Sequence, residues 1–231
     1  MTLRLVQFRA GDGSRGVAAA FEDDARRVDG VTTTYELALA ALDGGVTLEA
    51  AVKQRLSAER VDLRRALDEQ RILAPIDHPD SAHLHLTGTG LTHLGSAESR
   101  DKMHQAAASG PTTDSMRMFL MGMEGGKPAE GKIGVQPEWF YKGDGASIVA
   151  PGAPLPSPDF ALDGGEEPEI ACLYVIAPDG TPCRLGFALG NEFSDHVMER
   201  QNYLYLAHSK LRPCAIGPEI LVGEPPASIQ G

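Results

Sequence analysis

The sequence predicts an α+β fold in which a small N-terminal α/β module, residues 1–75, precedes a mostly β domain, residues 76–231. Between residues 33 and 70, apolar side chains recur at helical spacing among many charged ones. After residue 80 the chain changes to short apolar runs separated by glycine-rich loops, which is typical of β structure. The 231 residues, with 26 Gly and 16 Pro, suffice for a sizeable domain joined to a smaller one and predict many turns.

Two strands are expected at the start of the N-terminal module. Residues 2–8 and 16–22 are apolar runs with β-branched and aromatic members, and Asp29-Gly30 indicates a turn after the second run. The stretch 74–80, which contains two prolines, is expected to be the linker to the second domain.

Two helices are expected to complete the N-terminal module. The first covers residues 35–45, with Thr33 or Thr34 as its N-cap. The second covers residues 48–70, with Thr47 as its N-cap, because apolar residues recur at helical spacing along that whole stretch.

The second domain contains one clearly marked β-hairpin. Apolar residues occupy both faces of the strand that ends at Ile176, which is the pattern of a strand covered on both sides. Ala177-Pro178-Asp179-Gly180 then predicts a turn, and residues 183–191 predict a second strand. Strands joined by so short a turn pair antiparallel, so we expect a hairpin.

Three carboxylates are expected to meet at the open end of this hairpin. Glu167 and Glu169 are two residues apart and project from the same face of a strand, and folding the chain back brings Glu192 opposite them. Buried together, unpaired carboxylates either share protons or surround a metal ion. Ligands that are all oxygen favour Mg²⁺ ahead of Ca²⁺ or Mn²⁺. An exposed acidic hairpin end without a metal is the alternative explanation.

Composition excludes several classes of partner. The net charge of -11, without any basic run, argues against nucleic acid and against an anionic membrane surface. Cys172, Cys183 and Cys214 show no C-x-x-C spacing and are expected to be reduced structural thiols. Arginines interrupt the N-terminal apolar run, so no signal peptide is expected, and we expect a cytoplasmic protein.

The order of these motifs resembles the catalytic domain of the fumarylacetoacetate hydrolase superfamily. The shared elements are an E-x-E pair that opens a strand, a turn, and a strand that ends in Asn-acidic-x-Ser; the segments P-E-W-F-Y-K (137–142) and H-S-K (208–210) ahead of Gly217-Pro218 are also similar. The resemblance covers about residues 80–231. It implies a mostly β, barrel-like or roll-like catalytic domain that binds a divalent ion through Glu167, Glu169 and Glu192.

Three longer segments resemble the sugar-acid branch of this superfamily, whose members are 2-keto-3-deoxy-pentonate dehydratases. They are TGTGLTHLGSAESRDKMH, GVQPEWFYKGDG and LGNEFSDHVMERQNYLYLAHSKLR. The resemblance implies Mg²⁺-dependent dehydration of a keto acid derived from L-arabinonate or D-xylonate to 2,5-dioxopentanoate. It also implies a homodimer or a larger homo-oligomer. A hydrolase or decarboxylase of acylpyruvate-like diketo acids on the same scaffold is an alternative, as is an inactive metal-binding subunit.

The resemblance implies catalytic roles for Lys142, Lys210 and His93. Lys142 is the first candidate for contacting substrate or moving a proton, and a surface lysine before a turn is the alternative. Lys210 matches a later lysine region of the family, although its spacing to Gly217 is two residues shorter than the pattern. His93 is a candidate acid or base, and an exposed or structural histidine is the alternative.

Three departures from the family pattern bear on these expectations. His93 is followed at the H-x-x-E spacing by Ser96, which counts against a hydrolase. Glu192 stands where the hydrolases have aspartate. The superfamily pattern also continues beyond the motifs found here, so we expect the catalytic fold to lack its C-terminal strands.

Overall fold

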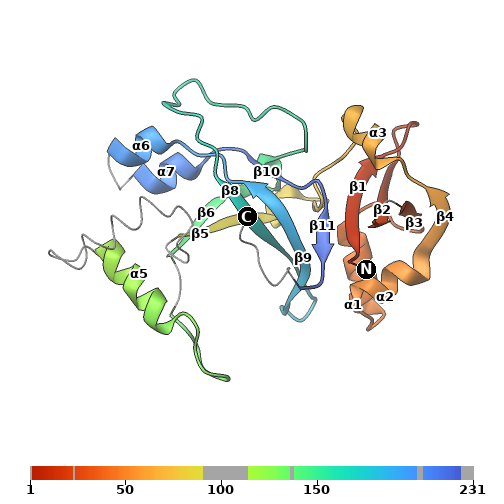
Figure 1. Ribbon diagram of the computed structural model, residues 1–231, viewed down its shortest axis with the longest axis horizontal. Coiled ribbons are helices and arrows are strands. Elements are labelled where there is room, and N and C mark those ends of the chain that lie inside the picture. Colours follow the sequence, from red (N-terminus) through yellow and green to blue (C-terminus); the bar gives the residue numbers. More distant parts are fainter. Residues whose placement is uncertain (1, 23, 91–113, 136–137, 202–204, 225–231) are drawn as a thin grey trace. The chain divides into compact units, whose positions relative to one another are not determined.

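The computed structural model describes the whole chain except residues 1, 23, 91–113, 136–137, 202–204 and 225–231. It confirms an α+β fold rich in sheet (Figure 1). The strands are β1 Arg4–Arg9, β2 Arg15–Phe21, β3 Asp24–Val28, β4 Leu56–Arg60, β5 His85–Gly90, β6 Glu138–Asp144, β7 Ile148–Val149, β8 Pro168–Ile176, β9 Pro182–Asn191, β10 Cys214–Ile216 and β11 Ile220–Val222. The helices are α1 Thr34–Asp43, α2 Leu48–Arg55, α3 Leu63–Asp68, α5 Asp114–Gly125, α6 His196–Gln201 and α7 Leu206–Lys210, with short 3₁₀ helices η1 Ser81–His83 and η2 Gly145–Ser147.

The contacts within the chain divide it into two compact parts. One part comprises Met1–His85 and Gly143–Gly231, and the other comprises Leu86–Lys142. The second part contains α5 and most of β5 and β6, which pair as a separate two-stranded sheet. The Met121 and Met123 side chains of α5 are exposed, so they do not fill a core.

A nine-stranded sheet organises the first part. Its strands follow the order β4-β3-β2-β1-β11-β9-β10-β7, and β8 pairs with β9 outside this path. In this order β11, near the C-terminal end, lies between β1 and β9 (Figure 1). No pairing among the described strands joins the two ends of the path, β4 and β7. The sheet therefore crosses the expected boundary at residue 75, and the division into residues 1–75 and 76–231 stays a prediction.

The strand β1 is buried on both faces. Val6 and Phe8 pack with Ala18, Ala66 and Ile72 on one face. On the other face Leu5 and Gln7 are fully buried. β1 therefore forms the core of the N-terminal part between α3 on one side and the start of α1 on the other.

The helix α1 begins where the sequence predicts. The Thr33 hydroxyl accepts a hydrogen bond from the Glu36 backbone N–H, and the Glu36 carboxylate accepts one from the Thr33 backbone N–H, which makes a capping box. The helix ends before Gly44.

The prediction of a single helix over residues 48–70 is wrong. The structure has α2, then the strand β4, then α3, which Asp62 caps through a hydrogen bond from the Arg65 N–H. β4 pairs with β3, a strand that the sequence did not indicate, with Arg26 opposite Arg60 and Val28 opposite Leu56. Pairing to an available sheet edge has overridden the local helical propensity.

The predicted hairpin is confirmed in position and register. β8 pairs antiparallel with β9, Pro168 lies opposite Asn191, and the turn is closed by a hydrogen bond from the Ala177 N–H to the Thr181 carbonyl oxygen. Gly186 allows β11 to approach β9, because its φ is 153° and a Cβ there would lie 2.1 Å from the Leu221 carbonyl oxygen.

One expectation about β8 is wrong. Leu173 and Val175 on its inner face are buried, but Ile170, Tyr174 and Ile176 on the other face are 46%, 48% and 60% exposed. Among the described residues, β8 is therefore covered on one side. An apolar sequence on both faces could not distinguish this arrangement from burial on both faces.

The buried Gln7 side chain offers a test of how the N-terminal part is held together. Gln7 donates from Nε2 to the Ala74 carbonyl oxygen at 2.6 Å and accepts from the Thr34 N–H, at the start of α1, at 2.7 Å. Replacing Gln7 by Leu leaves both buried backbone groups without this partner. We expect the free energy of unfolding to fall by about 2–4 kcal/mol in urea titration. The exposed Gln54→Leu is the control, and an equal effect of the two substitutions would contradict this role.

Candidate metal centre

The strand pairing brings Glu167 and Glu192 together at the end of the hairpin. Glu167 directly precedes β8, Glu192 directly follows β9, and the Glu192 N–H donates to the Glu167 carbonyl oxygen at 2.9 Å. Gly165 and Ser194 extend the pairing with two reciprocal backbone hydrogen bonds of 2.9 and 2.8 Å. The backbone on both sides of the two glutamates is therefore fixed.

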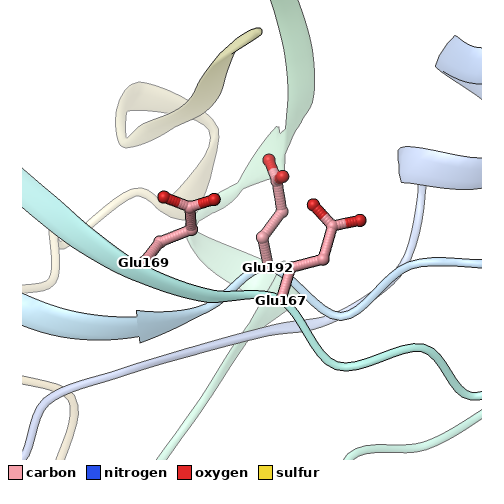
Figure 2. A group of neighbouring side chains, drawn as sticks. All are labelled: Glu167, Glu169 and Glu192. Atoms are coloured by element: carbon pink, nitrogen blue, oxygen red, sulfur yellow. The ribbon is translucent and has the colours of Figure 1, made fainter. Parts of the chain in front are cut away.

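Glu169 completes a group of three carboxylates. Glu167, Glu169 and Glu192 each place one carboxylate oxygen within 4.8 Å of the others. Figure 2 shows the three side chains projecting to the same side of the hairpin. Ligand oxygens on one Mg²⁺ at about 2.1 Å lie at most about 4.2 Å apart, and those on Ca²⁺ at about 2.4 Å lie at most about 4.8 Å apart. An oxygen-only group with separations of no more than 4.8 Å suits a hard divalent ion, at its full span Ca²⁺ and after a small closure of the side chains Mg²⁺.

The Lys210 side chain places a positive charge beside Glu167 and Glu192. Its Nζ lies 2.5 Å from Glu167 Oε1, 3.4 Å from Glu192 Oε2 and 3.3 Å from Glu199 Oε1. The Lys210 side chain is only 7% exposed. Burial acts to lower the pKa of Lys210, but the hydrogen bond to Glu167 and the charges of Glu192, Glu167 and Glu199 raise it above its ordinary value. Lys210 is therefore positively charged at neutral pH.

The same contacts keep Glu167 ionised. Partial burial acts to raise the pKa of Glu167, but the hydrogen bond and charge of Lys210, with smaller contributions from Glu192 and His196, lower it to about 2. The sequence left two ways to relieve carboxylate repulsion, a shared proton or a metal ion. The structure adds a third, a buried lysine.

The sequence patterns did not predict two further residues at this site, His196 and Glu199. His196 Nε2 lies 2.9 Å from Glu167 Oε1. Glu199 is one turn further along α6, accepts from the Ser209 hydroxyl at 2.9 Å and contacts Lys210. Their positions follow from the packing of α6 on α7, which no local pattern specifies.

A buried ion pair holds this helical segment in place. The pair joins Asp195, which precedes α6, to Arg212, which follows α7. Both residues are almost fully buried, and Arg212 Nη2 lies 3.2 Å from Asp195 Oδ2. Asp195 also accepts from the backbone N–H groups of Leu162 and Met198 at 2.8 and 2.9 Å. One carboxylate thus ties together the loop before β8 and both helices that carry Lys210 and Glu199.

Of the other expected catalytic residues, Lys142 belongs to the second compact part of the chain and His93 lies outside the described residues. Lys142 is buried at 3% exposure in β6, in the part comprising Leu86–Lys142, so the alternative of a surface lysine is not supported. Its contact with substrate stays a prediction. His93 lies outside the described residues, and its role also stays a prediction.

Removing Lys210 tests its role as the internal counter-charge. We expect Lys210→Met to lower the melting temperature of the metal-free protein, because Glu167, Glu192 and Glu199 lose their shared positive partner. The free energy of unfolding should fall by about 3 kcal/mol or more. The loss of a nearby positive charge should also make Mg²⁺ bind about tenfold tighter, measured by isothermal titration calorimetry. The exposed Lys53→Met should change neither quantity. Unaltered Mg²⁺ affinity in Lys210→Met would show that Lys210 does not oppose cation binding.

The Asp195–Arg212 pair predicts a pH-dependent stability. Burial acts to raise the pKa of Asp195, but the Met198 and Leu162 N–H groups and Arg212 lower it below its ordinary value of 3.8. The contribution of the Asp195 carboxylate to the free energy of unfolding is therefore complete above pH 3.8. It is lost as the pH falls through the lower pKa that Asp195 has in the folded protein. At pH 7, Asp195→Asn should reduce the free energy of unfolding by about 3 kcal/mol, because Arg212 stays buried without its partner. In urea titrations this deficit should shrink toward low pH, and a deficit independent of pH, or one matched by the exposed Asp159→Asn, would argue against the pair.

Comparisons with known proteins rest on structure. No family model and no curated protein matches the sequence. A 2-keto-3-deoxyarabinonate dehydratase matches with a TM-score of 0.62 and 21% sequence identity over 95% of this chain and 67% of that one. A 2-keto-3-deoxy-D-arabinonate dehydratase complexed with magnesium and 2,5-dioxopentanoate matches with a TM-score of 0.60 and 20% identity over 95% and 66%.

A hydrolase also shares the architecture. The fumarylacetoacetate hydrolase from Exiguobacterium antarcticum matches with a TM-score of 0.55 and 15% identity over 95% of this chain and 66% of that one. The chain thus spans about two thirds of the length of these structures. The chain shares the fold of these dehydratase and hydrolase structures.

Proposed function

We propose that the chain catalyses the Mg²⁺-dependent dehydration of a 2-keto-3-deoxy-pentonate to 2,5-dioxopentanoate. The observation that carries the proposal is the convergence of Glu167, Glu169 and Glu192 on this fold. A structure of the same fold, at 20% identity, is a dehydratase complexed with magnesium and 2,5-dioxopentanoate. The proposed substrate is therefore a 2-keto acid. Mn²⁺ and Ca²⁺ are the alternatives to Mg²⁺ as the bound ion.

The three glutamates would hold the ion and leave positions for the substrate. When bound, the divalent ion polarises the keto and carboxylate oxygens of a 2-keto acid and so acidifies the proton on C3. Loss of that proton and of the C4 hydroxyl gives an enone with a C5 hydroxyl, and tautomerisation of the enone gives the C5 aldehyde. Water is the only other product.

Lys210 is suited to a cationic role in this chemistry. Since its pKa is raised, Lys210 stays protonated and can donate a hydrogen bond to an oxygen that develops negative charge, but it is a poor base. Lys142 and His93 are the candidates for moving the C3 proton and assisting the departure of the C4 hydroxyl. These two roles rest on the resemblance and are proposals.

A second candidate is hydrolysis or decarboxylation of an acylpyruvate-like diketo acid. The match to a fumarylacetoacetate hydrolase favours it, because the same metal group would polarise a diketo acid in the same way. An inactive metal-binding subunit is the third candidate.

Other expectations about partners and localisation keep their status as predictions. None of the described helices is long and apolar enough to cross a membrane. The homodimer or larger homo-oligomer and the cytoplasmic location are further proposals.

Metal dependence and a glutamate substitution test the function together. We expect turnover of a 2-keto-3-deoxy-pentonate to disappear with EDTA and return with Mg²⁺. Glu169→Gln should lower turnover by about 100-fold or more and remove the rise in melting temperature caused by Mg²⁺, because the ion loses a charged ligand. Glu166→Gln removes the same charge from the exposed neighbour outside the group and should retain both.

The choice of substrate separates the three candidates. Turnover of acylpyruvates alone would refute the dehydratase proposal in favour of a hydrolase or decarboxylase. Stabilisation by Mg²⁺ without turnover of either keto acid would leave only the metal-binding subunit.

A further inference from the structure

One oxygen of Glu167 receives two side-chain donors. Lys210 Nζ lies 2.5 Å and His196 Nε2 lies 2.9 Å from the same atom, Oε1. Two donors on one oxygen restrict rotation of the carboxylate about its last bond. Both donors bind Oε1 rather than the second carboxylate oxygen of Glu167, Oε2. The orientation of Glu167 within the metal group is thus set from outside the group.

The backbone beside His196 is shaped for an imidazole. A Cβ on Gly165 would lie 2.5 Å from His196 Nδ1 and 2.6 Å from Cε1, closer than such atoms approach. Gly165 does not adopt a positive φ, so its backbone conformation alone does not require glycine. Its two hydrogen bonds to Ser194 prevent it from moving away from the ring. The absence of a side chain at residue 165 therefore serves the packing of His196.

The far side of the imidazole faces a second carboxylate. Asp163 Oδ2 lies 3.8 Å from His196 Nδ1, beyond hydrogen-bonding distance. Donation from Nε2 to Glu167 is available both to the neutral tautomer that carries the Nε2 proton and to the imidazolium. The contact to Glu167 therefore does not depend on the charge state of His196.

We propose that His196 is a positioning residue for the metal group. It donates from Nε2 to Glu167 Oε1 and holds this carboxylate in the orientation in which Glu167, Glu169 and Glu192 bind a divalent cation. Hydrogen-bonding partners of metal ligands typically contribute 10–100-fold to metal affinity through such orientation. The inference rests on the metal-binding part of the proposed function and is independent of which keto acid is the substrate.

The test measures metal binding in the absence of any keto acid. Mn²⁺ is titrated into the metal-free protein, and the free ion is followed by its electron paramagnetic resonance signal. We expect His196→Leu to raise the Mn²⁺ dissociation constant by about tenfold or more. His196→Gln, whose amide can still donate to Glu167, should recover most of the affinity, which a purely steric role of the ring would not give.

Two glycine substitutions form a matched pair for the same test. Gly165→Ala should displace the ring and weaken Mn²⁺ binding with His196 itself unchanged. Gly164→Ala adds the same methyl group one residue away, where a Cβ would meet only the Phe193 ring at an ordinary 3.5 Å, and should bind Mn²⁺ as the unsubstituted protein does. If His196→Leu fails to fold, as judged by its melting curve, the comparison of Gly165→Ala with Gly164→Ala decides the question.

The outcomes separate this inference from the proposed function. Mn²⁺ binding that is unchanged in His196→Leu, or in Gly165→Ala, overturns the positioning role even if the protein is a dehydratase. Binding that depends on His196 in a protein without keto-acid turnover supports the positioning role and refutes the dehydratase. Absence of Mn²⁺ binding in the unsubstituted protein overturns both.

Discussion

In the absence of a metal ion, the candidate metal centre depends on the ion pair between Lys210 and Glu167. Three carboxylates with oxygens within 4.8 Å of one another repel, and the partial burial of Glu167 and Glu192 weakens the screening by water. Lys210 balances part of this charge from a nearly buried position, which keeps Glu167 ionised and the lysine protonated. The group can therefore form before any metal binds. Its remaining negative charge still attracts a divalent ion, because one lysine cannot neutralise Glu167, Glu192 and Glu199 together.

The scaffold keeps these charges in place by backbone pairing and by one buried salt bridge. The β8–β9 hairpin fixes the separation of Glu167 and Glu192, and the reciprocal hydrogen bonds of Gly165 and Ser194 continue the pairing past the strand ends. The Asp195–Arg212 pair then anchors the helical segment from which His196, Glu199 and Lys210 project. Removing the charge of Asp195 would leave the buried Arg212 without its carboxylate partner, which is strongly destabilising. A small, rigid group of charged side chains is the result, and such rigidity is what metal coordination requires.

The same fold occurs in dehydratases and in a hydrolase, so the fold by itself does not select the reaction. A divalent ion held by carboxylates polarises a 2-keto acid in either chemistry. The choice depends on the groups that remove the C3 proton and assist the leaving group. The candidates for these roles, Lys142 and His93, belong to other segments of the chain than the three glutamates. In either proposed reaction, the protonated Lys210 beside Glu167 would assist an oxygen that gains negative charge.

The sequence by itself determined the features that depend on neighbours along the chain: the capped start of α1, the β8–β9 hairpin with its register, and thereby the meeting of Glu167, Glu169 and Glu192. These follow from periodicity, turn residues and the two-residue repeat of a strand. Tertiary structure alone decided that residues 56–60 join β3 as a strand, that one face of β8 is exposed, that Lys210 and His196 contact Glu167, and that Glu199 contacts Lys210. Such contacts join residues far apart in sequence, and their free energies depend on the packing of complete elements, which no local pattern encodes.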